Sequence, residues 1–149
     1  MLTRTSKVED FLSGDEEAQV IEAIRTAEKN TSGEIRVHLE AKSELPPLER
    51  AQEVFNFLHM NNTRHGNGVL IYVAVETHTL VILGDRGINE KVANNFWEST
   101  RDLVLGHFKK GEMKDGLVSG ILMAGEQLKS HFPYQVDDRD ELSNEISTS

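Results

Sequence analysis

The segment that most constrains the fold is residues 69–75, which read VLIYVAV without a charged residue. A strand with one solvated face alternates apolar and polar residues, whereas a strand covered on both faces is apolar throughout. The segment TLVIL at 79–83 follows after a short turn, Glu76-Thr77-His78, which is typical of a hairpin. The pattern therefore predicts a buried strand, its antiparallel partner and cover on both faces of their sheet.

The remaining segments predict one further strand and several helices. Periodicity and capping residues place a helix at 13–30 with a capping box, a strand at 33–41, a helix at 45–60, a helix at 90–108 with Asn89 as N-cap, and a helix from about 115 to 130. In the strand at 33–41, Ile35, Val37 and Leu39 alternate with polar residues, so we expect it near a sheet edge with one more polar face. This order predicts an α/β sandwich with a small mixed β-sheet.

The composition limits the kinds of partner and compartment. The chain has 149 residues, a length typical of one domain, and no run of about 18 apolar residues that would span a membrane. Its formal net charge of −9 opposes nucleic-acid binding and suits attraction of cations. It has no cysteine, which excludes disulfides, thiolate nucleophiles and Cys-ligated zinc. The start of the chain has no apolar core like that of a signal peptide, so we expect a cytoplasmic protein.

Composition also divides the chain into three parts. We expect a short N-terminal arm at 1–12, a folded domain at 13–131 and an acidic C-terminal tail at 132–149. The tail carries Leu142 and Ile146 four residues apart among its acidic residues. It is therefore either a helical docking strip for a protein partner or a solvated segment.

Three polar turns are predicted to meet at one edge of the sheet. A strand–helix–strand unit makes the strands at 34–41 and 69–75 parallel, and the tight turn makes 79–83 antiparallel to them. The start of the first, the start of the second and the end of the third then coincide: TSGE (31–34), RHGNG (64–68) and GDRGIN (84–89). The side chains gathered there are Glu34, Asn67, Asp85 and Asn89, with Arg64, His65 and Arg86 near them. Carboxylate, amide and backbone oxygens suit Ca²⁺ or Mg²⁺, and a helix start at this edge would suit an anion.

Each of these residues also has a structural interpretation. Gly84 and Gly87 fit a tight turn that needs positive φ, Asp85 fits a turn cap, and Asn89 fits a helix cap. Glu34 fits an ion pair with Arg36 or Arg86. Recognised catalytic signatures are absent: the chain has no P-loop, dinucleotide fingerprint, HExxH or GxSxG, and its RHG precedes a strand instead of following one. The segment HFKKGEMKDG (107–116) fits the end of one helix and the start of the next.

Four motifs occur in order along the chain: TSGEIRVHLE, GNGVLIYVAV, VILGDRGINEKV and FKKGEMKDGLVSGI. Together they resemble the TPM domain family, which includes thylakoid-lumen proteins implicated in photosystem II repair and many bacterial proteins. The resemblance covers 13–131 and implies a three-layer α/β/α sandwich whose small mixed sheet is flanked by about four helices. It also implies a divalent-cation site, calcium in particular, to which GDRGIN contributes Asp85 and Asn89 and SGE contributes Glu34. Many relatives have a Gly-Tyr-Gly-Leu-Glu-like turn in place of GDRGIN, and many have a signal peptide and a membrane anchor, so this chain resembles the soluble, cytoplasmic bacterial branch.

Two functions follow as expectations. The first is a divalent-cation-binding interaction module with Glu34, Asn67, Asp85 and Asn89 as metal ligands. The second is a metal-assisted acid phosphatase, an activity proposed for the plant branch of the family. In that case Asp85 would be a metal ligand or nucleophile, and Arg64 and Arg86 would contact the phosphate oxygens.

Overall fold

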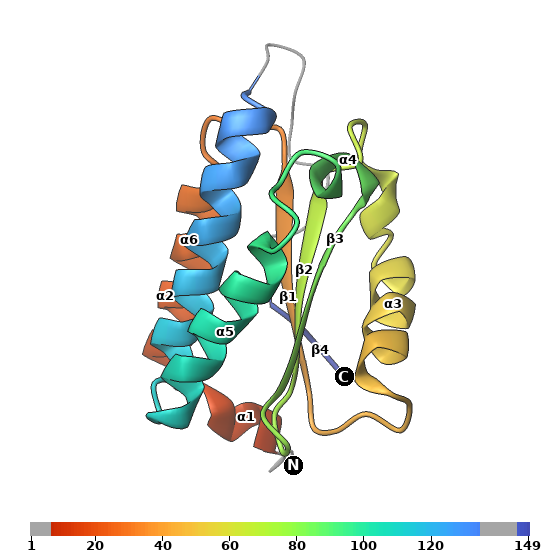
Figure 1. Ribbon diagram of the computed structural model, residues 1–149. Helices are drawn as coiled ribbons and strands as arrows, with labels where there is room; N and C mark the ends of the chain where they lie inside the picture. Colours follow the sequence, from red (N-terminus) through yellow and green to blue (C-terminus); the bar gives the residue numbers. More distant parts are fainter. Residues whose placement is uncertain (1–6, 135–145) are drawn as a thin grey trace.

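The computed structural model describes residues 7–134 and 146–149 as helices packed around one sheet (Figure 1). The elements in chain order are α1 (Lys7–Phe11), α2 (Gly14–Glu28), β1 (Glu34–Glu40), α3 (Pro47–Phe57), the 3-10 helix η1 (Met60–Asn62), β2 (Gly68–Ala74), β3 (Thr79–Gly84), α4 (Arg86–Asn89), α5 (Phe96–Lys109), α6 (Met113–His131) and β4 (Ser147–Thr148). In the described part of the chain, no helix is both long and apolar enough to cross a membrane.

The sheet has the strand order β3-β2-β1-β4 and is mixed. β1 and β2 are parallel in the register Glu34↔Gly68 to Glu40↔Ala74, and β3 is antiparallel to β2 from Val69↔Gly84 to Ala74↔Thr79. These directions confirm the prediction from the crossover and the hairpin. β4 adds to the other side of β1 in parallel and pairs only with His38 and Leu39, so β1 lies next to the edge of the sheet.

Helices cover both faces of the sheet, which confirms the three-layer sandwich. α2, α5 and α6 lie on one side and α3 on the other (Figure 1). The larger core forms on the side of α2, α5 and α6, around Ile35, Val37 and Ile71 of the sheet. The smaller core joins Ala51, Val54 and Phe55 of α3 to alternate residues of β2 such as Leu70 and Tyr72. Because β2 supplies side chains to both cores, all seven of its residues are buried.

The helix predicted at 90–108 is wrong at its start. A single turn, α4, ends at Asn89, and α5 begins only at Phe96. Asn89 therefore does not cap α5: its Nδ2 donates to the Gly84 carbonyl oxygen at 2.8 Å, and its Oδ1 accepts from Trp97 Nε1 at 2.7 Å. A tertiary contact between Asn89 and Trp97, which no local pattern reveals, closes the segment between α4 and α5.

The polar face of β1 is buried, not solvated. Glu34, His38 and Glu40 are each less than 5% exposed, on the face that α3 covers. Arg50 of α3 reaches this face and donates two hydrogen bonds to Glu40 Oε1 and one to Oε2. The alternating pattern therefore located the two faces of the strand correctly, while the polar face is covered through charge pairing.

Both ends of the described chain contact the domain. Val8 of α1 and Leu12 are each 8% exposed and belong to the larger core. At the other end, the Ser149 N–H donates to the Leu39 carbonyl oxygen at 3.1 Å, and Ile146 packs on the same core. The remainder of the tail, including Leu142, lies outside the described residues.

The capping box of α2 gives a first testable expectation. Ser13 Oγ accepts from the Glu16 N–H at 3.1 Å, and Glu16 Oε1 accepts from the Ser13 N–H at 2.9 Å. Changing Ser13→Ala leaves the Glu16 amide without its cap, so we expect the free energy of unfolding to fall by about 1 kcal/mol. Urea denaturation followed by circular dichroism measures this difference, and an unchanged midpoint would show that the cap does not contribute.

Candidate functional site

The three polar turns meet at the edge where β1 and β2 begin and β3 ends. The Glu34 N–H donates to the Asn67 carbonyl oxygen at 3.3 Å, and the Asp85 N–H donates to the Gly68 carbonyl oxygen at 2.8 Å. The Ile88 N–H then donates to the Gly66 carbonyl oxygen at 3.1 Å. The loop at 64–68 is therefore held on one side by β1 and on the other by the turn at 84–89, as the strand directions predicted.

Glycine is required in these turns for close approach more than for positive φ. A Cβ on Gly87 would lie 2.1 Å from the His65 carbonyl oxygen, and one on Gly84 would lie 2.7 Å from Asn89 Oδ1. Gly66, which sequence analysis did not single out, is the glycine of this site with positive φ, at 61°. The interpretation of Gly84 and Gly87 as positive-φ residues is therefore wrong, and contact between backbones explains them.

Asp85 and Asn89 line one cavity of about 390 Å³ between α3 and the end of β3. Gln52 and Asn56 of α3 add amide groups to its wall. Asp85 Oδ1 accepts from the Arg86 N–H at 2.8 Å, while its Oδ2 lies 3.9 Å from the position of a Cβ on Gly66. The cavity thus has one carboxylate among amide side chains.

Glu34 and Asn67 lie beneath this edge and do not line the cavity. Glu34 is 2% exposed and Asn67 is fully buried. Gly68 separates Glu34 from Asp85 in the sheet, and the Met60 carbonyl oxygen lies 2.8 Å from the position of a Cβ on Gly68. The structure therefore brings Asp85 and Asn89 together in the wall of one cavity, and neither Glu34 nor Asn67 lines it.

Asn67 has one polar atom that its neighbours leave unused. Its Nδ2 donates to Ser32 Oγ at 3.1 Å, and its backbone N–H donates to Thr63 Oγ1 at 3.1 Å. Its Oδ1 is buried and accepts no hydrogen bond from the described residues. A buried amide oxygen without a donor costs free energy unless a ligand or water contacts it. Within residues 7–134 and 146–149, no three His, Asp or Glu side chains lie close enough to hold a metal ion, so a cation here would rely on amide and backbone oxygens beside Asp85.

The two arginines predicted to contact an anion lie at the surface. Arg64 is exposed, and the Arg86 side chain is 88% exposed with its Nε 3.9 Å from Glu90 Oε2. The helix that follows Asp85 is the single turn α4, and Asp85 itself occupies its N-cap. An anion at this position would meet the Asp85 carboxylate.

A second polar cluster, which sequence analysis did not detect, lies under α3 at the other end of β1. Glu40 accepts from Arg50 and from the Tyr72 hydroxyl, and His38 Nε2 lies 3.4 Å from Glu40 Oε1. Burial raises the pKa of Glu40, but the hydrogen bonds from Arg50 and Tyr72 outweigh it and leave that pKa below its ordinary value. Burial also lowers the pKa of His38 and raises that of Tyr72. The cluster is thus a neutral His and a carboxylate held ionised by Arg50.

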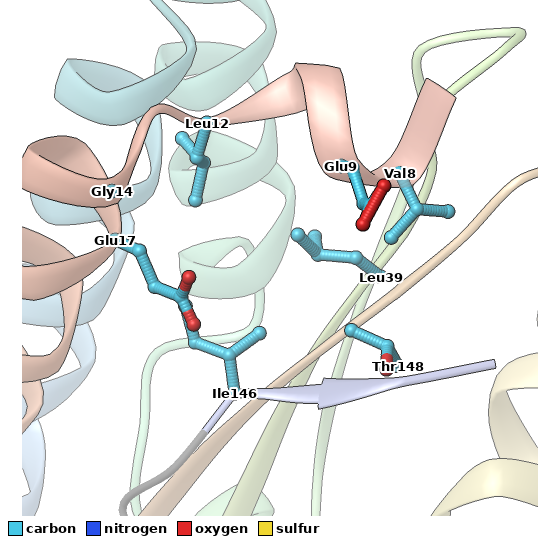
Figure 2. A pocket seen from close by; sticks show the side chains of 8 residues that line it. All are labelled: Val8, Glu9, Leu12, Gly14, Glu17, Leu39, Ile146 and Thr148. Atoms are coloured by element: carbon cyan, nitrogen blue, oxygen red, sulfur yellow. The ribbon is translucent and has the colours of Figure 1, made fainter. Parts of the chain in front are cut away.

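Another cavity, of about 470 Å³, lies between α1, the start of α2 and β4 (Figure 2). Glu9 and Glu17 contribute carboxylates to its wall, and Leu12, Leu39 and Ile146 contribute apolar side chains (Figure 2). The arm expected at 1–12 contains the helix α1, whose packing against β4 the sequence pattern did not predict. The cavity lies at the end of the sheet opposite Asp85.

Comparison with known proteins agrees with this architecture. The family model of the TPM domain matches residues 6–127. The NMR structure of the BA42 protein from the psychrophilic bacterium Bizionia argentinensis is 54% identical, with 95% of this chain and 98% of that chain covered at a TM-score of 0.87. No curated protein matches the chain.

Two more distant solved structures share the fold. The N-terminal domain of a protein from P. gingivalis is 18% identical over 84% of this chain and 83% of that chain, with a TM-score of 0.70. The N-terminal domain of a Corynebacterium glutamicum protein is 11% identical over 87% and 81%, with a TM-score of 0.64.

Proposed function

Because the chain belongs to the TPM domain family, we propose that it is a divalent-cation-binding module whose site lies at Asp85. The observation that carries the proposal is the position of one Asp85 carboxylate oxygen beside a loop that hydrogen bonds hold in place. Asp85 Oδ1 caps the Arg86 N–H, whereas Oδ2 is directed toward Gly66, in the loop held by the Ile88–Gly66 hydrogen bond. Asp85 would thus be the charged ligand of a site otherwise made of neutral oxygens.

The donor set favours Ca²⁺ over Mg²⁺. Ca²⁺ accepts six to eight oxygen ligands in irregular geometry, while Mg²⁺ requires near-ideal octahedral geometry. Asn67 Oδ1, buried and without a donor, is an amide oxygen of the kind Ca²⁺ uses. Asn89 lines the same cavity as Asp85 and adds an amide oxygen; its Oδ1 already accepts from Trp97, but an amide oxygen has a second lone pair. Glu34, which does not line this cavity, is left out of the proposed ligand set.

A titration of the protein with CaCl₂, followed by two-dimensional ¹⁵N–¹H NMR, tests this proposal. We expect the amide shifts to move at 66–68 and 84–89, and Asp85→Asn to weaken the affinity at least tenfold because it removes the charged ligand. Asp15→Asn, an identical change of charge in the exposed first turn of α2, should leave the affinity unchanged. Shifts confined to other regions, or equal affinity in Asp85→Asn, would contradict the site.

The same geometry gives less support to the phosphatase alternative. That activity needs a phosphate site beside Asp85, and a long helix start there would have supplied backbone N–H groups. α5 instead begins at Phe96, and the short α4 is already capped by Asp85. Arg86 points into solvent and not toward a cavity shared with Asp85. We therefore propose cation binding and not phosphoryl transfer as the function of this edge.

A further inference from the structure

The outermost strand of the sheet, β3, has features of a strand that pairs with another chain. Its sequence TLVILG contains no charge, no proline and no bulge residue that would discourage pairing. Val81, Ile82 and Leu83 are only partly buried. Natural proteins usually protect an edge strand with a lysine, a proline or a covering segment, because its free N–H and C=O groups attract other strands. Among the described elements, β3 has β2 as its only neighbour in the sheet.

The register identifies which backbone groups face outward. The Asp85 N–H donates to the Gly68 carbonyl oxygen, so Asp85 and alternate residues before it, Leu83 and Val81, direct their backbone groups to β2. Leu80 and Ile82 therefore direct their N–H and C=O groups away from the sheet. These two residues, on either side of Val81, could each exchange both backbone hydrogen bonds with an antiparallel partner strand.

A groove runs along this edge between α3 and α5. Its volume is about 310 Å³, and Leu48 of α3 and Trp97 of α5 line it together with Leu80, Val81 and Ile82. Leu48 is 54% exposed although it is a large apolar residue. Apolar side chains thus flank the open strand edge on both sides. A partner strand added at this edge would bury them.

The charges on the α5 wall indicate what that partner is. Glu98 and Arg101 both line the groove, one turn apart on α5. Arg101 has an exposed pairing with Asp102 at 3.2 Å, a type of ion pair that contributes little and is easily exchanged. A twofold axis through Val81, perpendicular to the sheet, would reverse the in-plane direction of α5 in the second copy, so that Glu98 of each copy could pair with Arg101 of the other across the shared groove. A surface with one acid and one base in this arrangement is complementary to itself.

We propose that β3 pairs with β3 of a second copy of this chain and forms a dimer with a continuous sheet. Leu80 of one copy exchanges both backbone hydrogen bonds with Ile82 of the other, and the twofold axis repeats the exchange. Leu48 and Trp97 of each copy cover the groove of the other. This inference does not depend on cation binding, because the edge lies along β3 and not at Asp85.

Charge reversal tests the proposal on the full chain. Analytical ultracentrifugation from micromolar to millimolar concentration should show the mass of the unmodified protein rising from one chain toward two. Glu98→Arg alone and Arg101→Glu alone each place like charges across the axis, so we expect each to weaken self-association about tenfold. An equimolar mixture of the two variants should associate again, since each copy then opposes the other with the complementary charges. Both variants should fold like the unmodified protein, because Glu98 and Arg101 are exposed on the surface of α5.

Amide hydrogen exchange provides the second measurement. The N–H groups of Leu80 and Ile82 should exchange slowly only at concentrations where the dimer forms, while those of Val81 and Leu83, bonded to β2, should be slow throughout. A protein that remains one chain at millimolar concentration, with fast exchange at Leu80 and Ile82, would overturn the proposal. So would a dimer that both single charge reversals leave intact, since it would use another surface.

Discussion

Replacing Glu40 with Gln should lower the free energy of unfolding by about 3 kcal/mol, the largest effect we expect from a single polar side chain. Glu40 is 4% exposed and accepts from Arg50 Nε at 2.9 Å, from Arg50 Nη2 at 2.8 Å and from the Tyr72 hydroxyl. Gln keeps the size but removes the charge, so Arg50 retains its positive charge without its buried partner. Because 28% of the Arg50 side chain is exposed, water compensates in part, and the effect falls at the lower end of the range for buried pairs.

Glu53→Gln is the matched control, because Glu53 binds the same guanidinium. Glu53 Oε1 accepts from Arg50 Nη1 at 3.1 Å, yet 55% of its side chain is exposed. An exposed pair contributes about 0.2–1 kcal/mol, so this variant should be nearly as stable as the unmodified protein. Urea denaturation at neutral pH compares the two. Equal losses in Glu40→Gln and Glu53→Gln would show that burial does not determine the contribution of the pair.

The unmodified protein and Glu40→Gln should also differ in how their stability responds to acid. Burial raises the pKa of Glu40, but Arg50 and Tyr72 outweigh it, so the folded-state pKa lies below the ordinary value of 4.5. A carboxyl with a lowered folded pKa contributes stability that is present above the unfolded pKa and is lost as the pH falls through the folded value. The stability difference between the unmodified protein and Glu40→Gln should therefore be complete above pH 4.5 and narrow below it. A difference that stays constant into acid would contradict a charged Glu40.

The strand arrangement was predictable because local rules leave few alternatives. A right-handed crossover through the helix now observed as α3 makes β1 and β2 parallel, and a short turn reverses β3. These directions alone bring the starts of β1 and β2 to the end of β3. The predicted gathering of Glu34, Asn67 and Asp85 at one edge follows from strand polarity, and the structure shows that Asp85 lines a cavity with Asn89 that neither Glu34 nor Asn67 lines.

Side-chain depth was not predictable in the same way. Glu34 and Asp85 lie on either side of Gly68 in the sheet, but the Met60 carbonyl oxygen of η1 lies over Gly68. The position of η1 depends on how α3 packs on β2, which periodicity does not specify. For the same reason Glu40 and Arg50, ten residues apart in two different elements, gave no pattern that would identify a buried pair.

The start of α5 shows a related limit. Residues 90–95 carry side chains that are compatible with a first helical turn, so the pattern extended the helix back to Asn89. In the structure, Asn89 instead bridges the Gly84 carbonyl and the Trp97 indole. Helix starts depend on such competing side-chain hydrogen bonds, which are made across the turn and not along it.

Replacing Gly87 with Ala should separate the two loops that hold the candidate cation site. A Cβ at this position would lie 2.1 Å from the His65 carbonyl oxygen and 2.6 Å from that of Gly66, and both neighbours are backbone. One loop must move, and the Ile88–Gly66 hydrogen bond of 3.1 Å is the contact most directly affected. We expect the free energy of unfolding to fall by about 2 kcal/mol. If the cation binds between these loops, as we propose, its affinity should fall at least tenfold.

Gly106→Ala is the control for Gly87→Ala, because it adds the same methyl group where there is space. Nothing lies within 4 Å of its Cβ position, and it is in the interior of α5. Alanine there should raise the free energy of unfolding by about 1 kcal/mol through helix propensity and leave calcium affinity unchanged. Urea denaturation measures the stability of the two variants, and the NMR titration measures their calcium affinity. A Gly87→Ala protein as stable as the original would refute the close contact between the loops, whereas a destabilised one with unchanged affinity would place the cation elsewhere.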